Sequence, residues 1–152
     1  MYSKLGDVEM YWLSIERYEN WKTDEKTGFS FLGISDRKLK VAEEMKSRDL
    51  IITYISSGYG CFSDIREVVS DKPRRSKMGL VYDEPYPYQI DTKPLLILQK
   101  VQWLKIHNFV ARLDFLSKGK DWRQVLRHSP RKLVAADAEL IIGAIKDIYS
   151  PK

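Results

Sequence analysis

The sequence predicts an α+β domain, a small mixed barrel of five or six short strands with helices between and after them. Three observations predict it. Apolar runs of strand length alternate with turn-rich segments, a Gly-Tyr-Gly turn joins two of these runs, and residues 136–149 form an amphipathic helical pattern. The length of 152 residues fits one hydrophobic core. We therefore expect a single domain over residues 10–152, preceded by a flexible segment over residues 1–9.

The first part of the chain contains two strand-like and two helix-like segments. Residues 10–15 (MYWLSI) are aromatic and aliphatic and predict the first strand. Residues 16–26 set aromatic side chains among charges and predict a helical turn and a loop. Residues 28–34 contain two glycines and fit either a short strand or an irregular loop. Asp36 predicts the N-cap of a helix over residues 37–45.

The most informative segment is a predicted hairpin over residues 49–71. An apolar run over residues 50–55 is followed by Gly58, Tyr59 and Gly60 and then by an alternating run. Glycine adopts the positive φ that a tight hairpin connection requires. A tyrosine between two such glycines is predicted to lie exposed at the end of the hairpin, where it suits a flat ligand.

The second half of the sequence predicts a loop, two strands and a helix, followed by the amphipathic helix over residues 136–149. Residues 71–79 are basic and turn-rich and predict an exposed loop. Residues 86–92 and 95–101 predict two strands joined near Pro94. Residues 108–116 have the spacing of a helix with one apolar face.

Composition and charge limit the function. The net charge of +5 and the pI near 9.2 favour a polyanionic partner such as nucleic acid. A single cysteine, Cys61, excludes an internal disulfide and a cysteine-based metal cluster, and it indicates a reducing compartment. No apolar run approaches the roughly 20 residues that span a membrane. We expect a cytoplasmic protein that does not bind a membrane.

The sequence contains no recognisable catalytic or cofactor motif. His107 and His128 are not in a metal-ligand spacing, and neither G-x-x-x-x-G-K-[ST] nor G-x-G-x-x-G occurs. Asp83 and Glu84 precede a proline and fit a solvated turn better than a general acid–base pair. The sequence therefore predicts a protein that is not an enzyme and needs no cofactor or metal.

A basic segment near residue 120 is the first candidate for binding. Lysine and arginine neutralise phosphates, and an indole provides a face on which any base stacks. A solvated basic face is an equally good interpretation of this segment. Its predicted stacking residue is Trp122, and its predicted backbone contacts are Lys118, Lys120, Arg123, Arg127, Ser129 and Arg131.

A set of aromatic and small residues is the second candidate. A pocket for one extruded base needs ring faces for stacking and neutral hydrogen-bonding groups for the base edge. The alternative is that these aromatic residues belong to the core, which is the better interpretation for Phe31 and Phe62. The predicted pocket residues are Phe29, Ser30, Ser57, Tyr59 and Trp122.

In order and spacing, short motifs along almost the whole chain resemble the EVE domain, a PUA-like domain related to YTH domains. The resemblance spans residues 10–148, and each motif is short, so their order carries it. The motifs lie at residues 11–15, 19–21, 28–29, 48–54, 62–70, 86–88, 120–122 and 126–129.

The resemblance implies a PUA-like twisted β-barrel flanked by helices, with one pocket at its mouth. It implies a module that binds nucleic acid, DNA or RNA, through a modified cytosine or a methylated adenine. By position, Phe29 and Ser30 fall where YTH domains place a cage tryptophan and its neighbour. Ser57 and Tyr59 fall at the pocket mouth, and the segment with Arg127 and Ser129 meets the backbone.

Two other functions remain open on the sequence. ASCH domains are also PUA-like and include hydrolases of a modified nucleoside, an activity that requires a lysine and a carboxylate converging in the pocket. A protein-interaction module with a vestigial pocket would use the basic surface for an acidic partner. Turnover of a modified nucleoside would identify the hydrolase. Absence of nucleic-acid binding that depends on a modification would favour the protein-interaction module.

Overall fold

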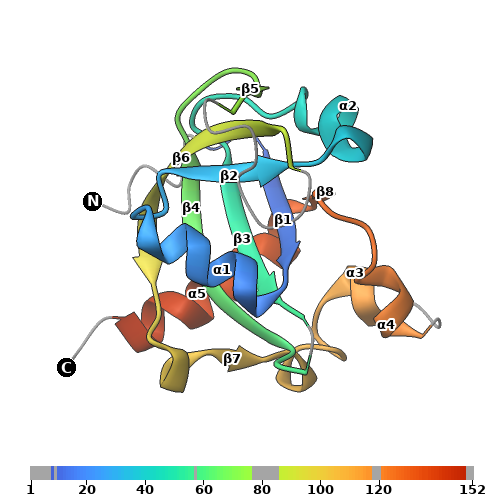
Figure 1. Ribbon diagram of the computed structural model, residues 1–152. Coiled ribbons are helices and arrows are strands. Elements are labelled where there is room, and N and C mark those ends of the chain that lie inside the picture. Colours follow the sequence, from blue (N-terminus) through green and yellow to red (C-terminus); the bar gives the residue numbers. More distant parts are fainter. Residues whose placement is uncertain (1–7, 9, 57, 77–85, 118–120, 150–152) are drawn as a thin grey trace.

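The computed structural model describes residues 8, 10–56, 58–76, 86–117 and 121–149 (Figure 1). The described chain is α+β, with a curled sheet in the strand order β2-β6-β4-β3-β1-β8. Strands β1 and β3 are parallel, and every other neighbouring pair is antiparallel. The predicted fold class is confirmed. The six strands are β1 (Tyr11–Glu16), β2 (Phe31–Ile34), β3 (Leu50–Ile55), β4 (Cys61–Val68), β6 (Tyr88–Ile97) and β8 (Arg131–Leu133).

Two short strands and several helices complete the described fold. Strand β5 (Arg74–Arg75) pairs with β6, and β7 (Leu104–Lys105) pairs with β4. The α-helices are α1 (Tyr18–Lys26), α2 (Leu39–Ala42), α3 (Asp114–Ser117), α4 (Trp122–Val125) and α5 (Ala135–Tyr149). The 3-10 helices are η2 (Asp36–Lys38), η3 (Lys100–Gln102) and η4 (Ile106–Asn108).

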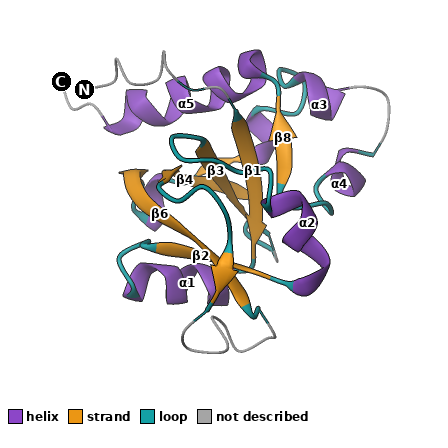
Figure 2. Ribbon diagram, turned by 90° about the horizontal axis from the view of Figure 1, so that it is seen from above, coloured by secondary structure: helices purple, strands orange, loops and turns teal. Residues whose placement is uncertain are grey.

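Helices α1 and α5 lie on opposite sides of the sheet (Figure 2). Helix α5 buries Ile141 and Ile145 in a core cluster that also includes Leu13 and Ile52 of the central strands. A second cluster, around Trp12, fills the space near β2 and α2. The amphipathic pattern of the last helix is confirmed, since its apolar face packs on the sheet. Among the described residues, no helix has both the length and the apolar character needed to cross a bilayer.

The hairpin prediction is confirmed, and one strand prediction is wrong. Strands β3 and β4 pair antiparallel, and the turn between them holds Gly58 at φ 92° and Gly60 at φ 61°. Instead of two strands joined near Pro94, the single strand β6 passes through the proline. The ladder between β4 and β6 shifts register where Arg66 faces Pro94, so the proline sits at an irregularity that tolerates its missing N–H.

Two helix predictions are also corrected. The helix expected over residues 37–45 is a 3-10 turn followed by the four-residue α2, and Ser35 rather than Asp36 is at its N-cap. The helix expected over residues 108–116 is mostly turns, with α3 at its end. The carboxylate of Asp137 accepts from the backbone N–H groups of Asp114 and Phe115 at 2.8 and 3.1 Å, so a contact distant in sequence starts that helix later.

Candidate ligand-binding cavity

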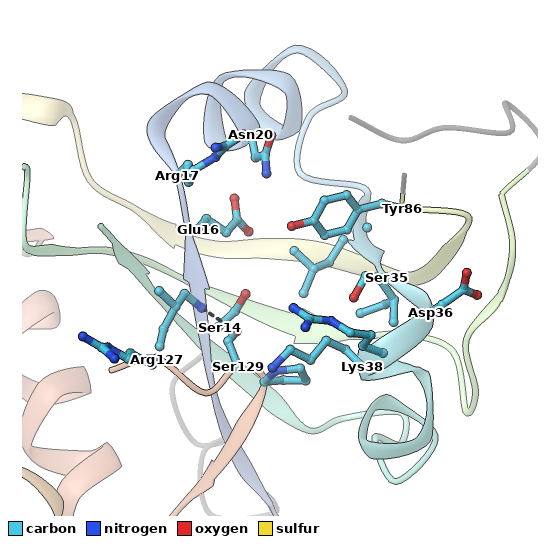
Figure 3. Close-up of a pocket in the computed structure, with 16 residues that line it drawn as sticks. Ser14, Glu16, Arg17, Asn20, Ser35, Asp36, Lys38, Tyr86, Arg127 and Ser129 are labelled. Carbon is cyan, nitrogen blue, oxygen red and sulfur yellow. Dashed lines mark hydrogen bonds between the residues drawn. The ribbon is translucent and has the colours of Figure 1, made fainter. Parts of the chain in front are cut away.

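A cavity of about 480 Å³ opens beside the second half of β1 (Figure 3). Its walls come from β1 and the start of α1, from β2 and the 3-10 turn after it, from one residue before β6, and from the segment before β8. The lining residues are Ser14, Ile15, Glu16, Arg17, Asn20, Leu32, Gly33, Ile34, Ser35, Asp36, Arg37, Lys38, Tyr86, Arg127, Ser129 and Pro130.

Three polar side chains from separate elements point into this cavity. Glu16 ends β1, Asn20 lies in the first turn of α1, and Tyr86 precedes β6. Figure 3 shows the Glu16 carboxyl group, the Asn20 amide and the Tyr86 hydroxyl directed towards the same space. Leu32 and Ile34 of β2 add an apolar wall. Apolar walls with a few converging polar groups are typical of sites for small, flat ligands.

The segment before β8 is fixed to β1 at the edge of the cavity. The backbone N–H of Ile15 donates to Ser129 Oγ at 2.8 Å, the dashed bond in Figure 3. This bond holds Ser129 against β1 and places Arg127 at the rim, with its side chain directed outward. The segment that the sequence predicted as a backbone contact therefore borders the cavity.

A buried charge network lies beneath Glu16. Arg66 on β4 is fully buried, and its guanidinium group contacts Asp24 and Asp64 at 2.8 Å each and Glu16 Oε2 at 3.4 Å. The indole N–H of Trp21 donates to Asp64 at 2.8 Å. Burial acts to lower the pKa of Arg66, but the negative charges of Asp64, Glu16 and Asp24 raise it well above its usual value. Three carboxyl groups thus share one guanidinium.

Glu16 is the member of this network that faces the cavity. Burial raises the pKa of its carboxyl well above the usual value, and the neighbouring charge of Asp24 raises it further, against the opposing effect of Arg66. Its Oε1 atom is buried and has no hydrogen-bond partner within the described part of the chain. A buried acceptor without a donor costs about 1–3 kcal/mol. A ligand that brings an N–H group to this atom removes that cost.

The rim of the cavity is basic. Arg17, Arg37 and Arg127 are exposed, and Lys38 is partly buried. Asp36 is the only acidic side chain besides Glu16 among the residues that line the cavity. Exposed cations around a polar cavity suit a ligand that carries phosphate groups outside its ring.

The structure places Phe29 in the core. Its ring packs against Trp21 at a centroid distance of 5.6 Å and under the Arg66 guanidinium at 4.9 Å. Phe29 has φ 55°, after Gly28 at φ 69°, and this left-handed turn directs the ring inward. Its neighbour Ser30 is exposed, and its carbonyl accepts from the N–H of Thr92 at 3.0 Å.

Tyr59 belongs to the same aromatic cluster as Phe29, through Trp21, whereas Trp122 packs elsewhere. Tyr59 contacts Tyr18 and Trp103 at centroid distances of 4.8 and 5.9 Å. Trp122 packs edge-on against His107 at 5.6 Å and beneath the Arg123 guanidinium at 4.7 Å. The four described members of the predicted pocket do not line the cavity, and Ser57 lies outside the described residues.

Two of the six residues predicted to contact the nucleic-acid backbone lie at the cavity. Arg127 and Ser129 line the cavity. Arg131 donates to the carbonyl of Val125 at 3.0 Å, and Arg123 lies over Trp122. Lys118 and Lys120 lie outside the described residues. The binding roles of all six stay predictions.

Sequence reasoning from the predicted pocket missed Ser14, Glu16, Asn20 and Tyr86. One signal was present: Ser14 and Glu16 are polar residues two apart at the end of an apolar run, so they share one face of a strand. The others belong to segments whose proximity depends on the tertiary fold, and local pattern gave no reason to group them.

Comparison with known proteins finds similarity of fold. No family model matches the sequence, and the search of curated proteins finds no match. Among solved structures, the YTH domain of Zygosaccharomyces rouxii MRB1 protein in complex with N6-methyladenosine RNA has a TM-score of 0.69 and 11% identity, covering 90% of this chain and 86% of that chain. A hypothetical protein from Leishmania major has a TM-score of 0.64 and 18% identity, covering 95% and 99%.

A third solved structure, the Pho92 YTH domain in complex with m6A, has a TM-score of 0.62 and 13% identity, covering 90% of this chain and 86% of that chain. These identities are low, and the comparisons therefore define the class of fold, which includes YTH domains.

Proposed function

We propose that this chain is a non-catalytic reader of nucleic acid, of the EVE type, that takes one modified nucleobase into the cavity beside β1. One observation carries the proposal. The Glu16 carboxyl group lines a cavity large enough for a nucleobase (Figure 3), and its buried Oε1 atom has no hydrogen-bond partner among the described residues. An extruded base brings a flat ring and N–H groups to such a site.

Modified cytosine and methylated adenine are the proposed ligands. Both bases carry an exocyclic amino group, and an N–H of that group would donate to the Glu16 carboxyl group. The Asn20 amide offers a donor and an acceptor for the rest of the base edge. The Tyr86 ring and the apolar wall of Leu32 and Ile34 would shield a methyl group from water, which favours the modified base.

The fold and the rim support the same proposal. Two of the similar solved structures are YTH domains in complex with N6-methyladenosine RNA and with m6A. Arg17, Arg37 and Arg127 surround the mouth of the cavity, where phosphates of a bound strand would pass. Extrusion of a base costs a few kcal/mol, so we expect weak binding to strands without the modification.

The proposal is tested by fluorescence anisotropy with matched oligonucleotides. The probes are single- and double-stranded DNA and RNA that contain cytosine, 5-methylcytosine, adenine or N6-methyladenine at one position. Asn20→Ala and Tyr86→Ala remove cavity groups, Trp122→Ala tests the predicted stacking residue, and Tyr149→Ala on α5 is an exposed control. We expect a preference for one modified probe that the two cavity variants lose. Equal binding to every probe would reject the reader.

A hydrolase of the ASCH kind is the second candidate function, and one observation favours it. Lys38 and Glu16, a lysine and a carboxylate, both line the cavity. Incubation of the protein with N4-acetylcytidine, followed by chromatography, tests it. Release of cytidine that Lys38→Ala abolishes would replace the reader by an enzyme, and unchanged nucleoside supports the reader.

A further inference from the structure

A pair of tyrosines with two lysines forms a surface outside the cavity. The rings of Tyr18 and Tyr59 lie 4.8 Å apart with an angle of 30° between their planes. Lys100 Nζ lies 4.5 Å from the centre of the Tyr18 ring and 4.8 Å from that of Tyr59, and Lys22 Nζ lies 5.9 Å from that of Tyr18. Tyr59 is 36% exposed. We name Tyr18, Lys22, Tyr59 and Lys100 the tyrosine platform.

Buried aromatic rings support the platform from below. The buried Trp103 contacts Tyr59 at 5.9 Å and Tyr18 at 6.1 Å, both edge-on. Trp21 stacks behind Tyr18 at 6.3 Å and is itself bonded to Asp64 of the charge network. A base that stacks on pre-ordered rings costs little conformational entropy in the protein.

Backbone hydrogen bonds join the platform to the cavity. The carbonyl of Glu16 accepts from the N–H of Ser56 at 2.8 Å, and the carbonyl of Ser56 accepts from the N–H of Tyr59 at 3.3 Å. On the other side, Tyr18 directly follows Arg17, which lines the cavity. The first turn of α1 therefore borders both the cavity and the platform, since Arg17 and Tyr18 are consecutive residues.

The composition of the platform matches a nucleotide rather than a protein side chain. The rings of Tyr18 and Tyr59 pack on each other, so the exposed Tyr59 ring is the surface on which a base would stack, and the exposed lysines would neutralise the phosphates on either side of it. Lys100 is exposed, lies over both rings and donates to the Tyr59 hydroxyl at 3.4 Å, so moving it aside costs one exposed hydrogen bond and no buried contact. Aromatic rings interleaved with cations are typical of surfaces that bind a single strand without reading its sequence.

We propose that a nucleotide neighbouring the base in the cavity stacks on the tyrosine platform, with Lys22 and Lys100 beside its phosphates. This inference rests on the proposed function, since the cavity holds the first base. The protein then grips at least two positions of one strand. The cavity selects the modified base, and the platform adds affinity for whichever base lies beside it.

The test separates the platform from the cavity. Single-stranded heptamers, in DNA and RNA, carry cytosine, 5-methylcytosine, adenine or N6-methyladenine at the centre, with ordinary neighbours or with abasic neighbours. We expect Tyr59→Ala to weaken binding of the ordinary heptamers about tenfold, since stacking on an aromatic ring contributes about 1–3 kcal/mol per base. With abasic neighbours, Tyr59→Ala should bind like the unchanged protein. Tyr59→Phe keeps the ring and should keep the affinity.

The binding of the heptamers to Tyr59→Ala distinguishes failure of the platform proposal from failure of the cavity proposal. A Tyr59→Ala variant that binds ordinary heptamers like the unchanged protein overturns the platform, whereas a surviving preference for a modified base leaves the cavity proposal intact. A Tyr59-dependent affinity without preference for any modification supports the platform and rejects the cavity. An equal loss with ordinary and abasic neighbours means that Tyr59 does not stack on a base, and absence of binding to every heptamer overturns both proposals.

Discussion

The interior below the cavity and the surface around its mouth hold charge in opposite ways. Below the cavity, Arg66 is fully buried and contacts three carboxyl groups within 3.4 Å. At the mouth, Arg17, Arg37 and Arg127 are exposed. Buried charges interact strongly and are costly to leave unpaired, whereas exposed charges are screened by salt. Under the proposed function, the interior would determine which ligand fits, and the rim would determine how tightly any polyanion is held.

Removing the buried cation should have the largest effect. Arg66→Met leaves three buried carboxyl groups without their guanidinium, so we expect a loss of about 3–5 kcal/mol in the free energy of unfolding. Urea unfolding followed by tryptophan fluorescence measures it.

The matched control is Arg74→Met. Arg74 pairs with Asp91 at 3.2 Å on the surface, with the arginine side chain 45% exposed. An exposed pair contributes at most about 1 kcal/mol. Equal losses in the two variants would show that burial gives the Arg66 network no special role.

Elements that depend on local sequence were predicted correctly, and elements that depend on contacts between distant residues were not. The β3–β4 hairpin depends on a local turn at Gly58 and Gly60, and α5 on local periodicity, so both followed from the sequence. The path of β6 through Pro94 depends on an irregularity opposite Arg66, a partner far away in sequence. Local pattern contains no information about that pairing.

The candidate site shows the same limit. The basic segment before β8 was predicted, and Arg127 and Ser129 indeed reach the cavity, since charge runs are visible in composition. Phe29 was expected in the pocket, but its positive φ turns the ring towards Arg66. Glu16, Asn20 and Tyr86 meet only after β1, α1 and the start of β6 have packed together.

A cavity side chain gives the next largest effect. Tyr86→Ala removes the aromatic face of the cavity, and we expect about tenfold weaker binding of the preferred modified probe, because a lost base–ring stack costs about 1–3 kcal/mol. Fluorescence anisotropy measures it, and Tyr86→Phe should retain most of the affinity. An equal loss of affinity for unmodified probes would mean that Tyr86 contributes to nucleic-acid binding in general and not to selection of the modified base.

The Glu16 carboxyl group should make the stability of the protein depend on pH. Its raised folded pKa means that protonation favours the folded state, so its contribution to stability is present below the unfolded value of about 4.3 and is lost as pH rises through the folded pKa. Glu16→Gln does not titrate. We therefore expect the variant to gain stability relative to the unchanged protein as pH rises through this window. Urea unfolding at several pH values measures the gain, and a constant difference contradicts it.

Removing one exposed charge at the rim should have the smallest effect. Arg127→Gln removes one exposed cation at the cavity mouth, so we expect about two- to threefold weaker binding to modified and unmodified probes alike. The slope of log affinity against log salt should fall by about one. Arg112→Gln, an exposed arginine over Phe109 that does not line the cavity, is the control and should change neither quantity. If Arg127→Gln instead altered the preference between modified and unmodified probes, the rim would share in selection, and the division between a selecting interior and a gripping surface would be wrong.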